Sequence, residues 1–182
     1  MAAVGTLSGP ADDRELVARF LATRDEGAFC TLYQAHTPYL WRLAVRLCPG
    51  ARGEAEEIVQ ETWVRSVRLL PRFAWGSALR TWLAGILINC QREGYRASLR
   101  RAALEAEESR PESATAEDGV DLERALASLS EERRTVLLLF DLEGHTHEEI
   151  ATMLQIPAGT SKSRLFAARR ALRELLGRGS SR

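Results

Sequence analysis

The sequence is poor in cysteine, and its three cysteines, Cys30, Cys48 and Cys90, lack Cys-x-x-Cys spacing. Their odd number and scattered positions argue against a disulfide framework or a zinc site, so a reducing compartment fits best. The sequence also has no apolar run long enough to cross a bilayer, and its N-terminus lacks the basic start and apolar core of a signal peptide. We therefore expect a soluble cytoplasmic protein without membrane insertion.

The chain has no net charge, because its 25 basic residues are balanced by 25 acidic residues. Overall charge therefore gives no reason to expect nucleic-acid binding. The distribution is uneven, however: residues 92–101 carry a net charge of +3 and residues 158–176 carry +4, whereas residues 105–123 carry −7. Lysine is nearly absent, and Lys162 in the second basic segment is the only one.

No segment alternates apolar and polar residues convincingly enough to predict a β-strand, whereas apolar residues recur at helical spacing along most of the chain. We therefore predict an all-α fold. In the first half, we expect Asp12 and Asp13 to cap a short helix and Asp25 to begin a second. A third follows over residues 54–70, and Ser77 can cap a fourth.

The composition divides the chain into two small helical domains joined by a linker. Residues 102–120 contain most of the acidic cluster but no aromatic residue, which predicts a flexible, self-repelling connection. The expected division is a disordered tail (1–10), a first domain (11–101), the linker (102–120), a second domain (121–177) and a tail (178–182). Each domain is small, so each core is expected to be modest.

Residues 144–173 have the pattern of a helix-turn-helix. Thr146 and Glu149 fit a capping box, and Pro157 ends the first helix because the residue before proline is driven out of the helical region. The second helix, from Ala158, carries five basic residues and leucines at helical spacing. In such motifs the second helix enters the DNA major groove. The plainer alternative is a solvated basic helix with a leucine seam.

Three motifs, in order along the chain, carry a resemblance to a known family. They are Glu56-Glu57-Ile58-Val59-Gln60-Glu61-Thr62-Trp63, then Arg80-Thr81-Trp82-Leu83 through Ile88-Asn89, and then Ile156 to Arg170. Together they resemble bacterial RNA polymerase sigma factors of the sigma-70 superfamily, extracytoplasmic-function (ECF) group, over about residues 12–176. The resemblance implies a factor, not itself an enzyme, that binds core polymerase and directs it to a two-part promoter.

The first motif implies contact with core RNA polymerase. In the family this helix binds the clamp helices of the β′ subunit, and the β flap is a further expected partner. The matching positions, Glu57, Gln60 and Glu61, put a carboxylate and amide edge on a helix whose inner side carries Val59 and Trp63. Without the resemblance, the same edge fits an ordinary solvated acidic face.

The second motif implies recognition and melting of the minus-10 promoter element. Aromatic residues interleaved with arginines suit single-stranded DNA, because bases stack on rings and phosphates meet cations. In the family, the loop before the melting helix and an asparagine on that helix form a pocket for a flipped base, and Phe73 and Asn89 match them. Phe73 can equally be a loop anchor, and Trp82 is expected in the core. The expected minus-10 contacts are Phe73, Arg80, Asn89, Arg92 and Arg96.

The third motif implies recognition of the minus-35 element. The residues expected near base edges are Lys162, Ser163 and Phe166, with Arg164 and Arg169 nearer phosphates and Thr160 at the helix start. Ser161 and Ala167 depart from the family's common valine and arginine, which leaves the sequence preference open but not the docking mode. The family also implies an anti-sigma factor as a partner, and no cofactor or metal is expected.

Two other functions stay open from the sequence. A conventional helix-turn-helix repressor needs a dimer interface for two half-sites, and no additional dimerisation helix is evident. A metal-dependent enzyme would have to use His145, His147 and Glu148, whose spacing is not a helical i, i+4 pair. No serine, cysteine or histidine arrangement pairs a nucleophile with a base, so no catalytic residue is expected.

Overall fold

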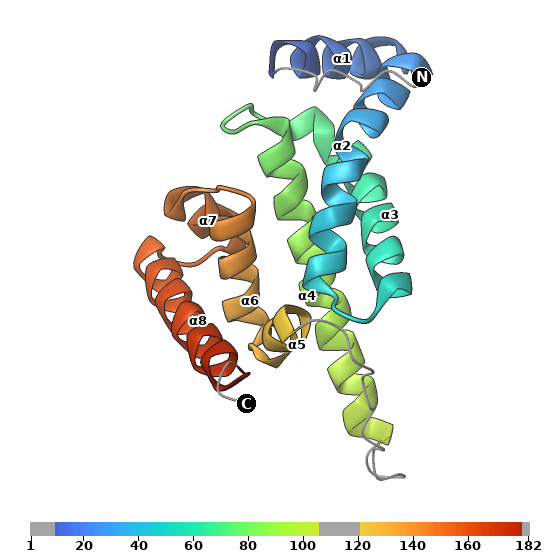
Figure 1. Ribbon diagram of the computed structural model, residues 1–182. Helices are drawn as coiled ribbons and strands as arrows, with labels where there is room; N and C mark the ends of the chain where they lie inside the picture. The colour runs from blue at the N-terminus through green and yellow to red at the C-terminus, as the bar shows by residue number, and fades with distance from the viewer. Residues whose placement is uncertain (1–9, 106–120, 180–182) are drawn as a thin grey trace, which may run out of the picture.

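The structure is a computed structural model that describes residues 10–105 and 121–179, and all regular elements in those ranges are helical (Figure 1). The all-α prediction is confirmed. The elements are α1 (Pro10–Thr23), α2 (Glu26–Leu47), α3 (Arg52–Leu69), η1 (Leu70–Arg72), α4 (Leu79–Glu105), α5 (Asp121–Ser128), α6 (Glu131–Leu137), η2 (Leu138–Leu142), α7 (His147–Leu154) and α8 (Ala158–Gly179). Helix α4 extends past residue 101 into the predicted linker. The rest of that linker and most of both predicted tails lie outside the described residues.

Helices α1 to α4 form the first domain around a shared apolar core. Asp25 begins α2 as predicted, because its side chain accepts a 3.1 Å hydrogen bond from the backbone N–H of Ala28. Helix α2 contacts α1, α3 and α4. Leu40 and Leu43 of α2 are fully buried, and Trp63 turns inward from α3, as the helical spacing predicted. Within the described residues, no helix combines the length and apolarity that a membrane span needs.

Two predicted helix starts are wrong. Asp12 and Asp13 lie inside α1, and the buried Asp13 carboxylate lies 3.0 Å from the ring Nε2 of His36 on α2. Helix α4 begins two residues after Ser77, whose hydroxyl donates to the carbonyl of Ala78. Short polar side chains near a helix start can bond the local backbone or a distant group, so the sequence pattern does not decide between these outcomes.

Helices α5 to α8, with the π-helical turn η2, form the second domain and contain the predicted helix-turn-helix. The capping box is confirmed: the Thr146 hydroxyl accepts from the Glu149 N–H, and the Glu149 carboxylate accepts from the Thr146 N–H. Gln155 ends α7 in the left-handed conformation with φ of 54°. Buried Ser161 of α8 lies 2.9 Å from Nδ1 of His147, which ties α8 to α7.

The two domains lie against each other, an arrangement that the sequence did not predict (Figure 1). Helix α7 packs on α4, and α2 contacts α6 and η2. Gly85 of α4 faces Met153 of α7, and a Cβ at Gly85 would lie 3.7 Å from the Met153 side chain, at an ordinary van der Waals distance. Buried apolar residues of both domains form one continuous cluster, so separating the domains exposes apolar surface to water.

Candidate nucleic-acid interface

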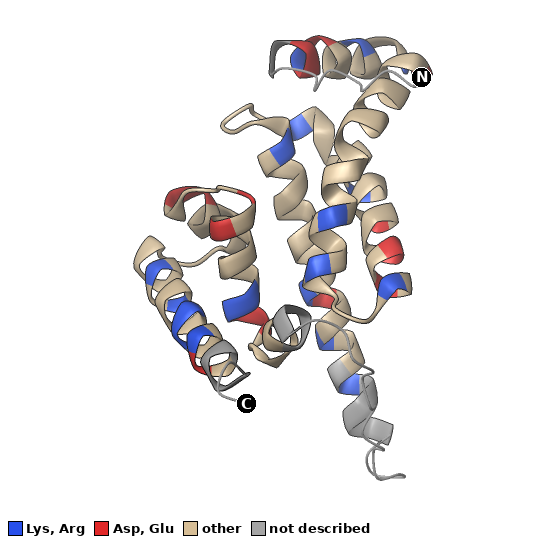
Figure 2. Cartoon of the chain, in the orientation of Figure 1, with Lys and Arg blue, Asp and Glu red and all other residues tan. Residues whose placement is uncertain are grey.

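Helix α8, which follows the turn of the helix-turn-helix, carries a concentration of basic residues (Figure 2), and most of them are exposed. Lys162 and Ser163 are exposed in its first turns, and Phe166 is 64% exposed. Thr160, near the helix start, is half-buried, and Leu165 faces inward as predicted. Cations, hydroxyls and an apolar ring on one open face match the polar and methyl edges that bases present in a major groove.

Two arginines of the same helix, Arg164 and Arg169, pair with acidic residues of the second domain. Arg164 Nη2 lies 2.8 Å from a carboxylate oxygen of Glu132. The Arg169 guanidinium donates to both carboxylate oxygens of Asp141 and lies over the Phe140 ring. The hydrogen bonds that Arg169 donates to Asp141 raise the pKa of Arg169. DNA phosphates would have to compete with these carboxylates for both arginines.

The loop between η1 and α4 carries a row of aromatic rings. Phe73 stacks on Trp82 of α4 with ring centroids 4.7 Å apart, and the Trp75 ring centroid lies 4.8 Å from that of Phe73. Arg14 of α1 places its guanidinium carbon 5.0 Å from the Trp75 ring centroid. Phe73 is therefore anchored by two neighbouring rings. Trp82, expected in the core, is half-buried and packs against it.

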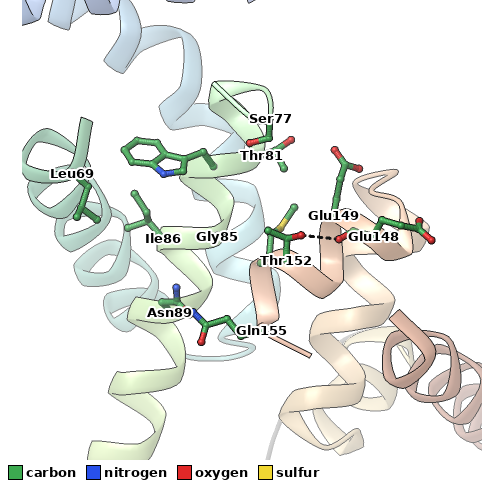
Figure 3. Close-up of a pocket in the computed structure, with 13 residues that line it drawn as sticks. Leu69, Ser77, Thr81, Gly85, Ile86, Asn89, Glu148, Glu149, Thr152 and Gln155 are labelled. Atoms are coloured by element: carbon green, nitrogen blue, oxygen red, sulfur yellow. Dashed lines mark hydrogen bonds between the residues drawn. The ribbon is translucent and has the colours of Figure 1, made fainter. Parts of the chain in front are cut away.

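A cavity of about 470 Å³ lies between α4 and α7 (Figure 3). Trp82, Ile86 and Asn89 line it from α4, whereas Met153 and Gln155 line it from the second domain. Asn89, a predicted minus-10 residue, therefore points to a space whose opposite wall is the helix-turn-helix.

Two of the predicted minus-10 arginines bind the second domain. Arg80 Nη2 lies 3.2 Å from Oε2 of Glu143, and Arg92 donates a 3.3 Å hydrogen bond to the carbonyl of Leu154. Arg96, further along α4, is exposed. Arg80 and Arg92 thus contact the second domain directly, whereas Asn89 is exposed and lines the cavity between α4 and α7.

Glu143 is the centre of a polar cluster that the sequence did not reveal. Its side chain is 6% exposed and also pairs with Arg46 at 2.8 Å. Nearby, the Tyr39 hydroxyl lies 3.2 Å from Nε2 of His145, and the Arg80 guanidinium carbon lies 3.7 Å from the Tyr39 ring centroid. Burial and the Glu143 charge raise the pKa of Tyr39 to about 12, and burial lowers the pKa of His145. These residues come from segments far apart in the sequence, so no local sequence motif indicates the cluster.

The two histidines considered above as metal ligands have other partners. His145 lies against Tyr39, and His147 lies against Ser161 and stacks on Phe140 at 4.4 Å. Within the part of the chain that the structure describes, no three histidine, cysteine, aspartate or glutamate side chains are grouped to hold a metal ion.

The acidic edge predicted on α3 is exposed, but one of its carboxylates is paired. Glu61 accepts a 2.6 Å hydrogen bond from Arg65, which also pairs with Glu93 of α4 at 2.7 Å. These two hydrogen bonds raise the pKa of Arg65. Glu57 and Gln60 are exposed and form the more open part of the edge.

Comparison with known proteins adds an independent observation. The family model described as Sigma-70 region 2 matches residues 32–101, and the one described as Sigma-70, region 4 matches residues 119–172. The ECF RNA polymerase sigma factor SigE of Mycolicibacterium smegmatis is 34% identical, covering 94% of this chain and 72% of that protein. The RNA polymerase sigma-H factor of Pseudomonas aeruginosa is 33% identical, covering 90% of this chain and 93% of that protein.

Solved structures resemble the chain over most of its length. The sigma factor RpoE from Bartonella quintana, solved in complex with the anti-sigma factor NepR, has 28% identity and a TM-score of 0.67, and the match covers 82% of this chain and 96% of that one. CnrH, solved with the cytosolic domain of CnrY, has 24% identity and a TM-score of 0.65, with 91% and 97% covered. The second likeness concerns the fold alone.

Proposed function

The chain belongs to the extracytoplasmic-function (ECF) sigma factors of the sigma-70 family, and from that premise we propose that it binds core RNA polymerase, directs it to a two-part promoter and helps to melt the downstream part. It is a transcription initiation factor, and we assign no enzymatic reaction to it. One observation carries the proposal: both family regions occur in order in one chain, and the second has an exposed basic recognition helix.

In this proposal the second domain reads the minus-35 element as duplex DNA. The exposed side chains of Lys162, Ser163 and Phe166 contact base edges from the major groove. Arg164 and Arg169 contact phosphates once they leave their carboxylate partners, and Thr160 lies at the helix start near the backbone. Support comes from the exposure of the first three residues and from the concentration of positive charge on α8.

The first domain holds the minus-10 element as single strand. Phe73 and Asn89 contribute to a pocket for a flipped base, and Arg80, Arg92 and Arg96 meet phosphates. The aromatic loop beside basic α4 supports this assignment, because rings and cations together suit unpaired DNA.

The closed arrangement of the two domains is then a form that does not bind minus-10 DNA. Arg80 and Arg92 already have partners on the second domain, and α7 lies across the cavity that Asn89 lines. A DNA strand that contacts Arg80 and Arg92 has to displace their partners on the second domain, and separation of the domains removes those partners. Any partner that binds only the separated form shifts the equilibrium toward that form by mass action. Core polymerase is such a partner, because it holds the two domains at separate places.

The α3 edge binds a basic surface of core polymerase through Glu57, Gln60 and Glu61. In the family this surface belongs to the β′ clamp helices. The β flap is a further polymerase contact. The complex of RpoE from Bartonella quintana with NepR supports a second kind of partner. We therefore also propose that an anti-sigma factor binds this protein.

The test is transcription by core polymerase from the protein's own genomic DNA, with the run-off transcripts sequenced. We expect new transcripts whose start sites share two sequence elements at a constant spacing. Core polymerase alone, and core polymerase with a variant truncated after residue 105, serve as controls. Transcripts indistinguishable from those of core polymerase alone would contradict the proposal.

A further inference from the structure

Trp75 has a backbone conformation that a tryptophan rarely adopts. Its φ of 58° lies in the left-handed region, where glycine is free of steric cost and a side chain with a Cβ is not. A glycine follows at position 76, so the loop has a flexible residue next to the strained one. Strained positions of this kind are concentrated at binding and active sites, where the surrounding structure holds them.

The Trp75 ring ends a row of flat groups. Trp82 stacks on Phe73 with 27° between the ring planes, and Phe73 in turn contacts Trp75. At the far end, Arg14 of α1 lies over the Trp75 ring at 5.0 Å. Phe73 is thus occupied by two neighbours, whereas Trp75 is covered by one ring and by the end of a flexible arginine side chain.

A guanidinium over an indole occupies the place that a nucleobase takes on an aromatic platform. Both are flat and stack on a π face, but an arginine at a half-exposed site is held only weakly there and can turn toward a phosphate. An unpaired base can therefore replace Arg14 on Trp75, while the displaced cation meets the backbone of the same strand.

We propose that Trp75 is a further base-stacking residue for one unpaired base of the minus-10 strand, and that Arg14 brings α1 into the promoter contact as a phosphate partner. This inference rests on the proposed function and adds two residues to it. It also assigns a stacking surface to Trp75, and Phe73 contributes to the same pocket by packing against the Trp75 ring.

The experiment uses holoenzyme on a promoter with a pre-opened minus-10 region, in which 2-aminopurine replaces one base at a time. The parent should quench the fluorescence strongly at one position. Trp75→Gly, which suits the left-handed backbone, should lose that quenching, whereas Trp75→Phe should keep most of it. An abasic site at the same position should weaken binding of the parent by roughly tenfold or more and leave Trp75→Gly nearly unchanged.

Trp75→Asn provides a second ringless variant, because asparagine also tolerates the left-handed region. Arg14→Ala should lower the salt dependence of binding by about one unit without changing the base preference. Its matched control is Arg52→Ala, which removes an arginine that lies over Trp41 at 5.6 Å outside the loop. Equal quenching by the parent and both ringless variants would overturn the inference, whereas a parent that fails to start transcription at any promoter would overturn the proposed function instead.

Discussion

Glu143 of the second domain pairs with Arg80 of the first, with Oε2 and Nη2 3.2 Å apart, although the resemblance assigns Arg80 to promoter DNA. The Glu143 side chain is 6% exposed and pairs with Arg46 through its other oxygen. In the proposed function Arg80 meets a minus-10 phosphate, so the nearly buried Glu143 carboxylate takes the place of that phosphate in this structure. DNA binding would then have to displace Glu143 from Arg80.

Glu143→Gln should favour separation of the domains. The substitution keeps the shape of the side chain and removes the charge that neutralises Arg46 and Arg80. Because both arginines are more than a third exposed, we expect a loss of roughly 1–2 kcal/mol, below the range of about 3–5 kcal/mol for a fully buried pair. Small-angle X-ray scattering should give a larger radius of gyration, and the free protein should bind a single-stranded minus-10 oligonucleotide several-fold more tightly.

Glu174→Gln is the matched control, because it removes a carboxylate whose partner Arg170 lies on the same helix. Its radius of gyration should equal that of the parent. If Glu143→Gln also scatters like the parent and gains no affinity for the oligonucleotide, Glu143 does not hold the domains closed.

Acid should open the protein through His145. Burial lowers its folded-state pKa, so the unfolded or separated state binds the proton more readily. The stabilisation is then complete above the ordinary pKa of about 6.5 and is lost as the pH falls toward the folded-state value. Glu143, Glu149 and Arg80 face the same ring, and Tyr39 stays neutral because burial raises its pKa.

Scattering measured about one unit above and one unit below pH 6.5 checks this. The radius of gyration should rise on the acid side for the parent, and His145→Gln should remove the rise. A parent whose dimensions are the same at both pH values contradicts the prediction.

Charge reversal on α3 should weaken polymerase binding without unfolding the chain. Glu57→Lys changes an exposed residue, so the free energy of unfolding should move by less than about 1 kcal/mol. Glu61→Lys should weaken binding too, but it also breaks the pairing with Arg65 and should cost more stability. Co-purification with core polymerase measures binding, and thermal unfolding measures stability. Glu56→Lys on the same helix is the control. Unchanged co-purification of both variants would remove this edge from the interface.

Lys162 and Arg164 should differ in their effect on the minus-35 element. Lys162→Ala should cost about 1–3 kcal/mol at one or two base positions and relax preference there. Arg164→Ala should weaken all sequences alike and reduce the salt slope by about one unit, because a phosphate contact carries no sequence information. Binding of each variant to a library of promoter sequences, measured at two salt concentrations, distinguishes a base contact from a phosphate contact. A uniform loss with Lys162→Ala would make Lys162 a phosphate contact.

The sequence predicts the local features of this fold well. The capping box of Thr146 and Glu149, the helix start at Asp25 and the inward face of α3 depend on neighbours a few residues away, and all three are confirmed. It fails where a partner is distant. Asp13 lies inside α1, and its buried carboxylate contacts His36 of α2 instead of capping a helix. The closed arrangement is missed for the same reason, since it depends on contacts across the whole chain length.

The candidate site divides in the same way. Lys162, Ser163 and Phe166 are placed by the period of a single helix, and the structure leaves them exposed as the pattern indicated. Their roles, like those of all the proposed contacts, remain predictions. Arg80 looks like a free cation in the sequence, and only the fold reveals that Glu143 neutralises it.

Footprinting of holoenzyme on one of its own promoters tests the central claim most directly. We expect two separately protected segments on the DNA, with permanganate-reactive thymines only in the downstream one, because in the proposed function the second domain binds duplex DNA and the first holds a single strand. A single symmetric footprint on fully paired DNA, of the kind a dimeric repressor makes, would contradict it.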